Sequence, residues 1–168
     1  MNTPRKHTVF PGQFFITTVP MLISTVLGSC IAVCLWDKRT NVAAMNHYLL
    51  PGKHDDLSGG ATRGYFSIHL MVRSLKNRKV RFEDVEAKVF GGSNSLYARN
   101  DIYKIGERNA IMAFEVLKHY GINVVAYHVG GTYGRKIVFN TATGKVRMRL
   151  LTKSTQEVNE DIDKGFGY

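Results

Sequence analysis

Cys30 and His47 are the two side chains of this 168-residue sequence whose types and spacing could perform covalent chemistry. A cysteine attacks as its thiolate, and an adjacent imidazole can accept the thiol proton and stabilise the resulting charge. The small residues Gly28 and Ser29 permit a sharp turn before the cysteine, and backbone N–H groups at such a turn can point at a developing oxyanion. The pattern therefore predicts a thiol nucleophile with its base.

A hydroxyl just upstream could complete the site. Ser24 or Thr25 could orient the imidazole or hold a substrate amide, and the residues alone leave both open. Spacing alone also permits a purely structural interpretation of the pair. Free cysteine is among the most buried residue types, and His47 could be a hydrogen-bonded core histidine of a strand.

A predicted hairpin brings the two side chains together. Two apolar runs, residues 31–36 and 43–50, flank a segment of turn composition, residues 37–41. Strand residues rise by roughly 3.3 Å each, so Cys30 and His47 lie near the open end of the hairpin, where they could face each other. A further loop, Gly91-Gly92, follows a predicted strand and could let the backbone approach a ligand.

The remaining pattern predicts one α/β domain with mixed strand pairing and two main helices. We expect the domain to span residues 1–152 and residues 153–168 to form a loose polar tail. Strands are expected at 13–19, 21–26, 85–90, 122–129, 135–140 and 145–151, and helices at 61–77 and 105–120.

The charge of the chain is strongly positive: 23 Lys and Arg against 13 Asp and Glu give +10. The cations are scattered, with the densest group in residues 73–81, and no nucleic-acid-binding motif accompanies them. Of three explanations for these cations, we therefore favour a solvated surface, then a surface that binds an acidic protein partner, and lastly a nucleic-acid-binding surface.

The composition also bears on where the protein is expected to work and on its cofactors. No apolar run approaches the ~20 residues of a membrane span, and no secretory signal is expected at the start. Cys30 and Cys34 are too close along one strand to link distant parts of the chain, so reduced thiols and a cytoplasmic location are expected. His54 beside Asp55 and Asp56 is a weak metal signal in a loop, and neither a metal nor an organic cofactor is predicted.

Several stretches resemble the CheD family, the chemoreceptor glutamine deamidases of bacterial chemotaxis. The resemblance extends over about residues 12–151 and keeps the family's order of motifs. They are Leu27-Gly28-Ser29-Cys30-Ile31-Ala32-Val33-Cys34, Ala44-Met45-Asn46-His47-Tyr48-Leu49-Leu50-Pro51, Glu86-Ala87-Lys88-Val89-Phe90-Gly91-Gly92-Ser93, Ile105-Gly106-Glu107-Arg108-Asn109, Gly130-Gly131 and Gly134-Arg135-Lys136.

The resemblance implies a layered α/β sandwich and a Cys–His pair with a nearby Thr. By position, Cys30 is the nucleophile, His47 the base, and the third residue falls on Ser24, with Thr25 next to it. It further implies hydrolysis of receptor glutamine side chains to glutamate, methyl-accepting chemotaxis receptors as substrates, and for some members a CheC-type phosphatase partner. The resemblance also implies that the protein acts at membrane-associated receptor arrays without inserting into the membrane.

Two other classes stay open. One is a non-catalytic adaptor that binds receptors or a phosphatase, and the other is a different thiol enzyme, such as a peptidase or transamidase. The substrate and oxyanion contacts we expect are Gly28, Ser29, Gly91 and Gly92.

Overall fold

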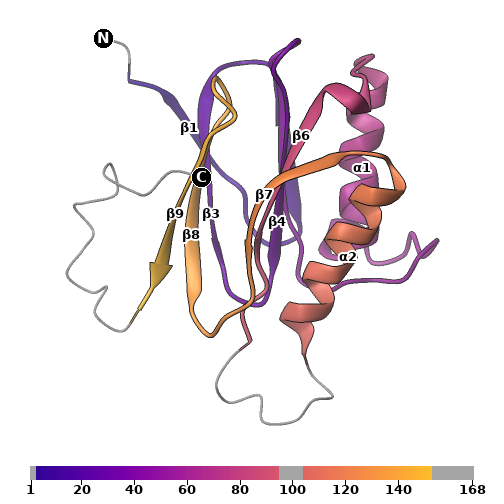
Figure 1. Cartoon of the computed structure of the whole chain (residues 1–168), viewed down its shortest axis with the longest axis vertical. Coiled ribbons are helices and arrows are strands. Elements are labelled where there is room, and N and C mark those ends of the chain that lie inside the picture. The colour runs from indigo at the N-terminus through magenta and orange to yellow at the C-terminus, as the bar shows by residue number, and fades with distance from the viewer. Residues whose placement is uncertain (1–2, 95–103, 153–168) are drawn as a thin grey trace.

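Two stacked β-sheets and two helices make up the computed structural model, which describes residues 3–94 and 104–152. A four-stranded sheet has the order β1-β3-β8-β9, and a five-stranded sheet has the order β2-β5-β4-β6-β7. Both helices lie on the outer side of the five-stranded sheet, so the other sheet keeps one face without helices (Figure 1). The strands are β1 (Arg5–Thr8), β2 (Gln13–Thr17), β3 (Met21–Leu27), β4 (Ile31–Asp37), β5 (Val42–His47), β6 (Val85–Gly91), β7 (Asn123–Val129), β8 (Gly134–Asn140) and β9 (Val146–Leu151), and the helices are α1 (Gly64–Asn77) and α2 (Ile105–His119).

The predicted mixed α/β fold with two helices is confirmed, as is the hairpin of β4 and β5. Several boundaries differ: β2 ends at Thr17 rather than at 19, and β5 ends at His47 rather than at 50. Helix α1 begins at Gly64, after a 3₁₀ turn at Gly60–Thr62, rather than at Ala61. Strand β1 was not predicted, because its polar, exposed sequence has no apolar alternation and it forms only by pairing in parallel with β3. The expected tail, 153–168, lies outside the described residues.

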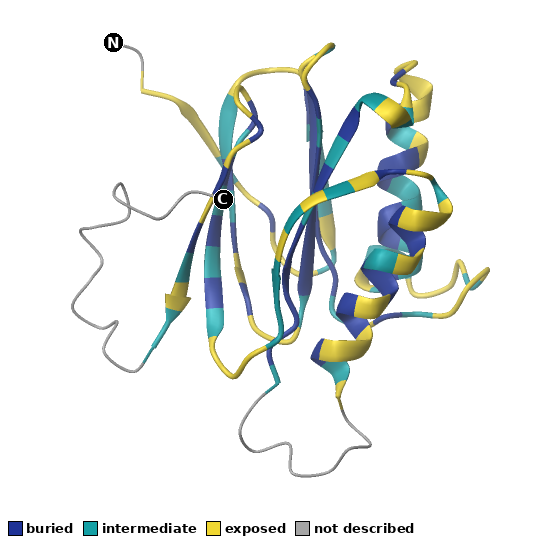
Figure 2. Cartoon of the chain, viewed as in Figure 1, coloured by how far each residue is buried: buried dark blue, intermediate teal, exposed yellow. Residues whose placement is uncertain are grey.

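Strand β4 lies at the centre of the molecule and is buried almost throughout (Figure 2). Its continuous apolar sequence is typical of a strand covered on both faces. Ile31, Val33 and Leu35 face the core beneath the helices, whereas Ala32 and Cys34 face the core between the two sheets. The alternation of β4 therefore decides which side chains lie between the sheets, and Cys30 packs against that same inner core.

The two helices cover the five-stranded sheet with apolar stripes. In α1 the stripe is Ile68, Met71, Val72 and Leu75, the i, i+3, i+4, i+7 spacing of one helix face. Helix α2 ends at His119, and the predicted cap glycine, Gly121, follows the C-cap residue with φ +66°, the left-handed conformation of that position. Among the described residues, neither helix combines the length and apolar content needed to cross a bilayer.

Candidate active site

A short elbow between β3 and β4 carries Cys30. Gly28 and Ser29 are exposed there and Cys30 is half-buried, so the thiol lies where the chain enters the core. The loop after β6 closes over the elbow through two backbone hydrogen bonds. Gly92 N–H donates to the Cys30 carbonyl at 2.8 Å, and Ser93 N–H donates to the Gly28 carbonyl at 2.9 Å.

The close backbone approach predicted at Gly91-Gly92 is made to the protein's own chain. Gly91 has φ +115°, and a Cβ there would lie 2.1 Å from the Cys30 carbonyl oxygen. Gly92 has φ +67°, and a Cβ there would lie 2.7 Å from the carbonyl oxygen of Gly106 in α2. Only glycine satisfies both the backbone conformation and the available space at these two positions. Gly91 and Gly92 therefore allow the loop after β6 to pack closely against the cysteine elbow on one side and α2 on the other.

His47 shares a face of the sheet with Cys30. Ile31 and Tyr48 form a backbone bridge, which sets His47 opposite Ala32 and makes Cys30 its diagonal neighbour. Diagonal neighbours in an antiparallel pair lie roughly 7–8 Å apart and are within reach of long side chains. The predicted facing is thus diagonal rather than direct, and both side chains point between the two sheets.

The His47 ring is held from the opposite sheet by Thr25 of β3. The Thr25 hydroxyl donates to the Val9 carbonyl at 2.7 Å, and its oxygen lies 2.8 Å from His47 Nδ1. A hydroxyl has one proton to donate, so the oxygen must accept from Nδ1–H. The network therefore assigns the tautomer with the proton on Nδ1, and leaves Nε2 as a lone-pair acceptor. Nε2 is buried and has no hydrogen-bond partner among residues 3–94 and 104–152.

Ser24, the neighbour of Thr25, points to the other side of β3. Its hydroxyl lies 3.5 Å from the Thr8 hydroxyl, on the face of the sheet turned away from His47. Of the two hydroxyls considered for the third position, the structure brings Thr25 to the imidazole.

Asn109 of α2 is a site residue that the sequence reasoning did not single out. Its side-chain amide donates to the Ser29 carbonyl and to the Leu49 carbonyl, both at 2.9 Å. The side chain is completely buried, and its own oxygen has no partner within the described part of the chain. One amide thus ties the cysteine elbow to the segment that follows His47. An asparagine on the apolar stripe of a predicted helix is the sequence signal that could have found it.

A buried arginine, Arg135, holds the turn after β7 close to the cysteine elbow. Arg135 is fully buried, pairs with Leu27 in the β3–β8 register, and donates to the carbonyls of His128 and Gly130. Gly130 N–H in turn donates to the Gly91 carbonyl at 3.0 Å. The turn after β7 is therefore packed against the loop that closes the elbow.

Burial shifts both members of the pair toward their neutral forms. It raises the pKa of the Cys30 thiol above 9.0, an effect that the residue's own backbone N–H partly offsets. It lowers the pKa of His47 below 6.5, against the opposing effect of the Val9 carbonyl. At neutral pH the resting pair is a thiol and a neutral imidazole, so the base must remove the proton as the thiol attacks.

Metal ligands are not gathered in the part of the chain that the structure describes, where no three His, Cys, Asp or Glu side chains form a cluster. His54, whose loop gave a weak metal signal in the sequence, lies on the surface with its Nε2 3.5 Å from the Glu115 carboxylate. The second cysteine, Cys34, is free and fully buried in the core between the sheets.

These features define a class: an α/β protein of two stacked sheets, with a half-buried cysteine at a strand elbow beside a strand histidine of fixed tautomer. Comparison with known proteins specifies it further. The family model described as CheD chemotactic sensory transduction matches residues 49–150. A Trichlorobacter lovleyi protein named "Probable chemoreceptor glutamine deamidase CheD" is 43% identical over 155 residues, 91% of this chain and 93% of its own. A Sulfurimonas denitrificans protein of the same name is 35% identical over 151 residues, 89% of this chain and 96% of its own.

The chain belongs to the CheD family. The family model begins after Cys30 and His47, but the Trichlorobacter match covers 91% of the chain and so must span both. A solved structure, the Bacillus licheniformis hypothetical protein YfiH, is also partly similar. It has a TM-score of 0.47 at 14% identity, over 77% of this chain and 59% of its own.

Proposed function

We propose that this protein deamidates glutamine side chains of methyl-accepting chemotaxis receptors, with Cys30 as nucleophile and His47 as general base and acid. The curated relatives carry the name of such a deamidase. The observation that carries the mechanism is the fixed His47 ring: Nδ1 is engaged by Thr25, and no described residue is bonded to Nε2, on the face that Cys30 shares.

In the first half-reaction, His47 Nε2 takes the thiol proton as Cys30 Sγ bonds to the amide carbon of the glutamine. The carbonyl electrons move to oxygen and form a tetrahedral oxyanion. When this collapses, the C–N bond breaks, and the imidazolium returns its proton to the leaving nitrogen, which departs as ammonia. A thioester between Cys30 and the substrate remains.

In the second half-reaction, His47 Nε2 takes a proton from water as the hydroxide attacks the thioester carbon. The C–S bond breaks, the thiol recovers its proton, and glutamate is released. One water is consumed and one ammonia is formed for each glutamine. Thr25 acts throughout as a positioning residue, because its oxygen accepts from Nδ1–H in both protonation states of the ring.

The backbone of the elbow is our candidate for stabilising the oxyanion. In a trans peptide the carbonyl and the N–H point in opposite directions. Because Asn109 holds the Ser29 carbonyl from the side of α2, the Cys30 N–H is directed away from that helix. Gly28 and Ser29 are both exposed and Gly28 has no side chain, which favours access of an amide substrate to the elbow.

Deamidation is best tested by measuring ammonia released from a purified receptor cytoplasmic fragment, with peptide mass spectrometry of the same sample. We expect stoichiometric ammonia and glutamate at specific glutamines, and loss of both in Cys30→Ala and His47→Ala. Cleavage of the backbone would instead identify a peptidase, and incorporation of an added amine a transamidase. Binding of the fragment without any ammonia would identify an adaptor.

Three further properties remain proposals drawn from the family. We place the reaction on the helical cytoplasmic part of the receptors, and therefore in the cytoplasm. A CheC-type phosphatase is a second candidate partner. We also treat residues 1–152 as the catalytic domain and 153–168 as an appended polar segment. A truncation at residue 152 that keeps full ammonia release would support that division, and an inactive but folded truncation would contradict it.

A further inference from the structure

Among the residues that the structure describes, no helix covers the face of the four-stranded sheet turned away from the core (Figure 1). Strand β8 alternates between half-buried and buried residues, whereas the central strand β4 is buried on both faces (Figure 2). The half-buried set of β8 includes Lys136, Val138 and Asn140, which point outward. A groove of about 800 Å³ crosses this face at the end where β8 turns into β9.

The side chains of the four described strands bring charge of one sign to this face. None of its four strands, all of them described by the structure, contains Asp or Glu. Three lysines line the groove: Lys6 from β1, Lys136 from β8 and Lys145 from the turn before β9. Leu22 and Val138 form an apolar floor between them, and Met21, which also packs against the core between the sheets, lines the groove at its edge.

The strand register gives the dimensions of the groove. Lys6 pairs with Leu22, Leu22 pairs with Asn140, and Asn140 N–H bonds the Lys145 carbonyl. Lys6 and Lys145 are therefore three strand spacings apart, roughly 14 Å at ~4.8 Å per spacing. An α-helix with its side chains is about 10–12 Å wide. One helix can thus lie on the apolar floor with a lysine along each side.

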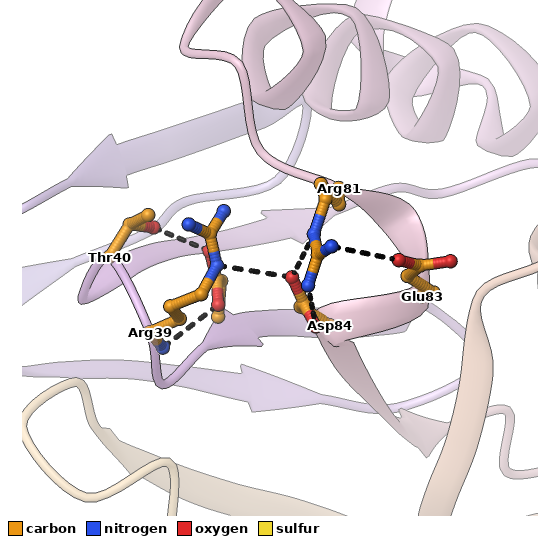
Figure 3. Close-up of polar contacts among 6 residues, drawn as sticks. Arg39, Thr40, Arg81, Glu83 and Asp84 are labelled. Atoms are coloured by element: carbon orange, nitrogen blue, oxygen red, sulfur yellow. Dashed lines mark hydrogen bonds and ion pairs between the residues drawn. The ribbon is translucent and has the colours of Figure 1, made fainter.

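The cationic stretch of residues 73–81 differs from the groove because carboxylates lie close to it. Near the densest cationic stretch, Arg81 pairs with Glu83 and Asp84, and Arg39 also reaches Asp84 at 3.1 Å (Figure 3). These arginines hold the pKa of the Asp84 carboxyl below its ordinary value. Cations in that region are partly neutralised by carboxylates of the chain itself, as expected of a solvated surface.

We infer that the groove between Lys6 and Lys145 docks an acidic helical segment of a protein partner, at a distance from the cysteine elbow. The one-sign charge favours a carboxylate-bearing partner, and the apolar floor favours an amphipathic helix over a phosphate backbone, which offers no apolar face. Ser24 lines the groove, whereas Thr25 contacts the catalytic histidine, so the two sites lie on opposite faces of β3.

This inference rests on the proposed function only for the choice of partner, a receptor cytoplasmic fragment. Binding is measured in the Cys30→Ala background of the full chain, which keeps docking separate from turnover. We expect the Lys6→Glu/Lys145→Glu pair to weaken binding of the fragment at least tenfold at low salt and to flatten its salt dependence. With the active cysteine present, the same pair should raise KM and leave kcat unchanged.

Lys76→Glu/Lys79→Glu, on the end of α1 and the turn after it, is the control of equal charge change and should bind as the parent does. Equal affinity of the two double variants would overturn the inference. It would also be overturned if the groove variant lost binding to single-stranded DNA or to phosphatidylserine vesicles but kept the fragment. A third contrary outcome concerns the acidic residues of this chain's own C-terminal segment. If the fragment binds only after they are neutralised in the variant Glu157→Gln/Glu160→Gln/Asp161→Asn, the occupant of the groove is that segment. Binding without deamidation would contradict the proposed function alone.

Discussion

Thr25 Oγ1 lies 2.8 Å from Nδ1 of His47, and this contact joins the two β-sheets at the imidazole. Because the Thr25 proton is already donated to the Val9 carbonyl, the contact fixes which ring nitrogen is free to act as a base. A strand of one sheet thus sets the chemistry of a side chain on the other. The proposed mechanism depends on that relationship.

Removing the Thr25 hydroxyl should slow the reaction without abolishing it. A net hydrogen bond of about 0.5–1.5 kcal/mol corresponds to a roughly 2- to 10-fold lower kcat for Thr25→Val. Thr25→Ser keeps the hydroxyl and should recover most of the rate, and Ser24→Ala should keep the wild-type kcat. A Ser24→Ala variant that is as slow as Thr25→Val would assign the third role to Ser24 instead.

The resting state of the thiol can be measured by alkylation. Since burial raises the pKa of Cys30 above 9.0, its reaction with iodoacetamide should accelerate with pH and have a midpoint above 9.0. Cys34 is fully buried with a strongly raised thiol pKa, and should stay unmodified in the folded protein. Fast alkylation of Cys30 that is independent of pH around neutrality would show a preformed thiolate–imidazolium pair and contradict this assignment.

The activity should fall on the acid side at a pH set by His47. The base must be neutral to accept the thiol proton, and burial lowers its pKa, so the acid limb of kcat/KM should lie below pH 6.5. Stability should follow the same sign. A group whose pKa is lowered by folding stabilises the protein above its unfolded pKa, so unfolding should become easier as pH falls below about 6.5. His47→Gln should reduce that pH dependence, and an acid limb above 6.5 would argue for a different base.

Much of this architecture could be predicted from sequence because it is local. The hairpin of β4 and β5 follows from two apolar runs and a polar turn, and Gly121 marks the end of α2. The choice between Ser24 and Thr25 could not be made, because it depends on how β3 packs against β8 and across to β5. The Asn109 contact with Ser29 spans 80 residues, a distance over which no periodicity carries information.

Asn109 is expected to act as a positioning residue for the elbow. Asn109→Ala leaves the Ser29 and Leu49 carbonyls without their donor, and because both contacts are only part-buried the cost should be about 1 kcal/mol for each, the low end of the range for a lost hydrogen bond. It should also lower kcat with little change in KM, since the Cys30 peptide loses its orientation. Ser67→Ala is the control, because Ser67 accepts from Asn46 at 3.0 Å in a buried contact away from the elbow. Equal losses of kcat in the two variants, measured at matched stability, would reduce Asn109 to a structural role.

Cys30 attacks the glutamine in the proposed mechanism, and a second cysteine in β4, packed against the same core, allows this role to be tested directly. Cys30→Ala and Cys34→Ala remove the same thiol from the same inner face, four residues apart. Site-resolved mass spectrometry of a receptor cytoplasmic fragment would follow conversion of each glutamine to glutamate by the wild type and both variants. We predict conversion by the wild type and by Cys34→Ala, and none by a folded Cys30→Ala. Glutamate formed at the same positions by Cys30→Ala would contradict the mechanism.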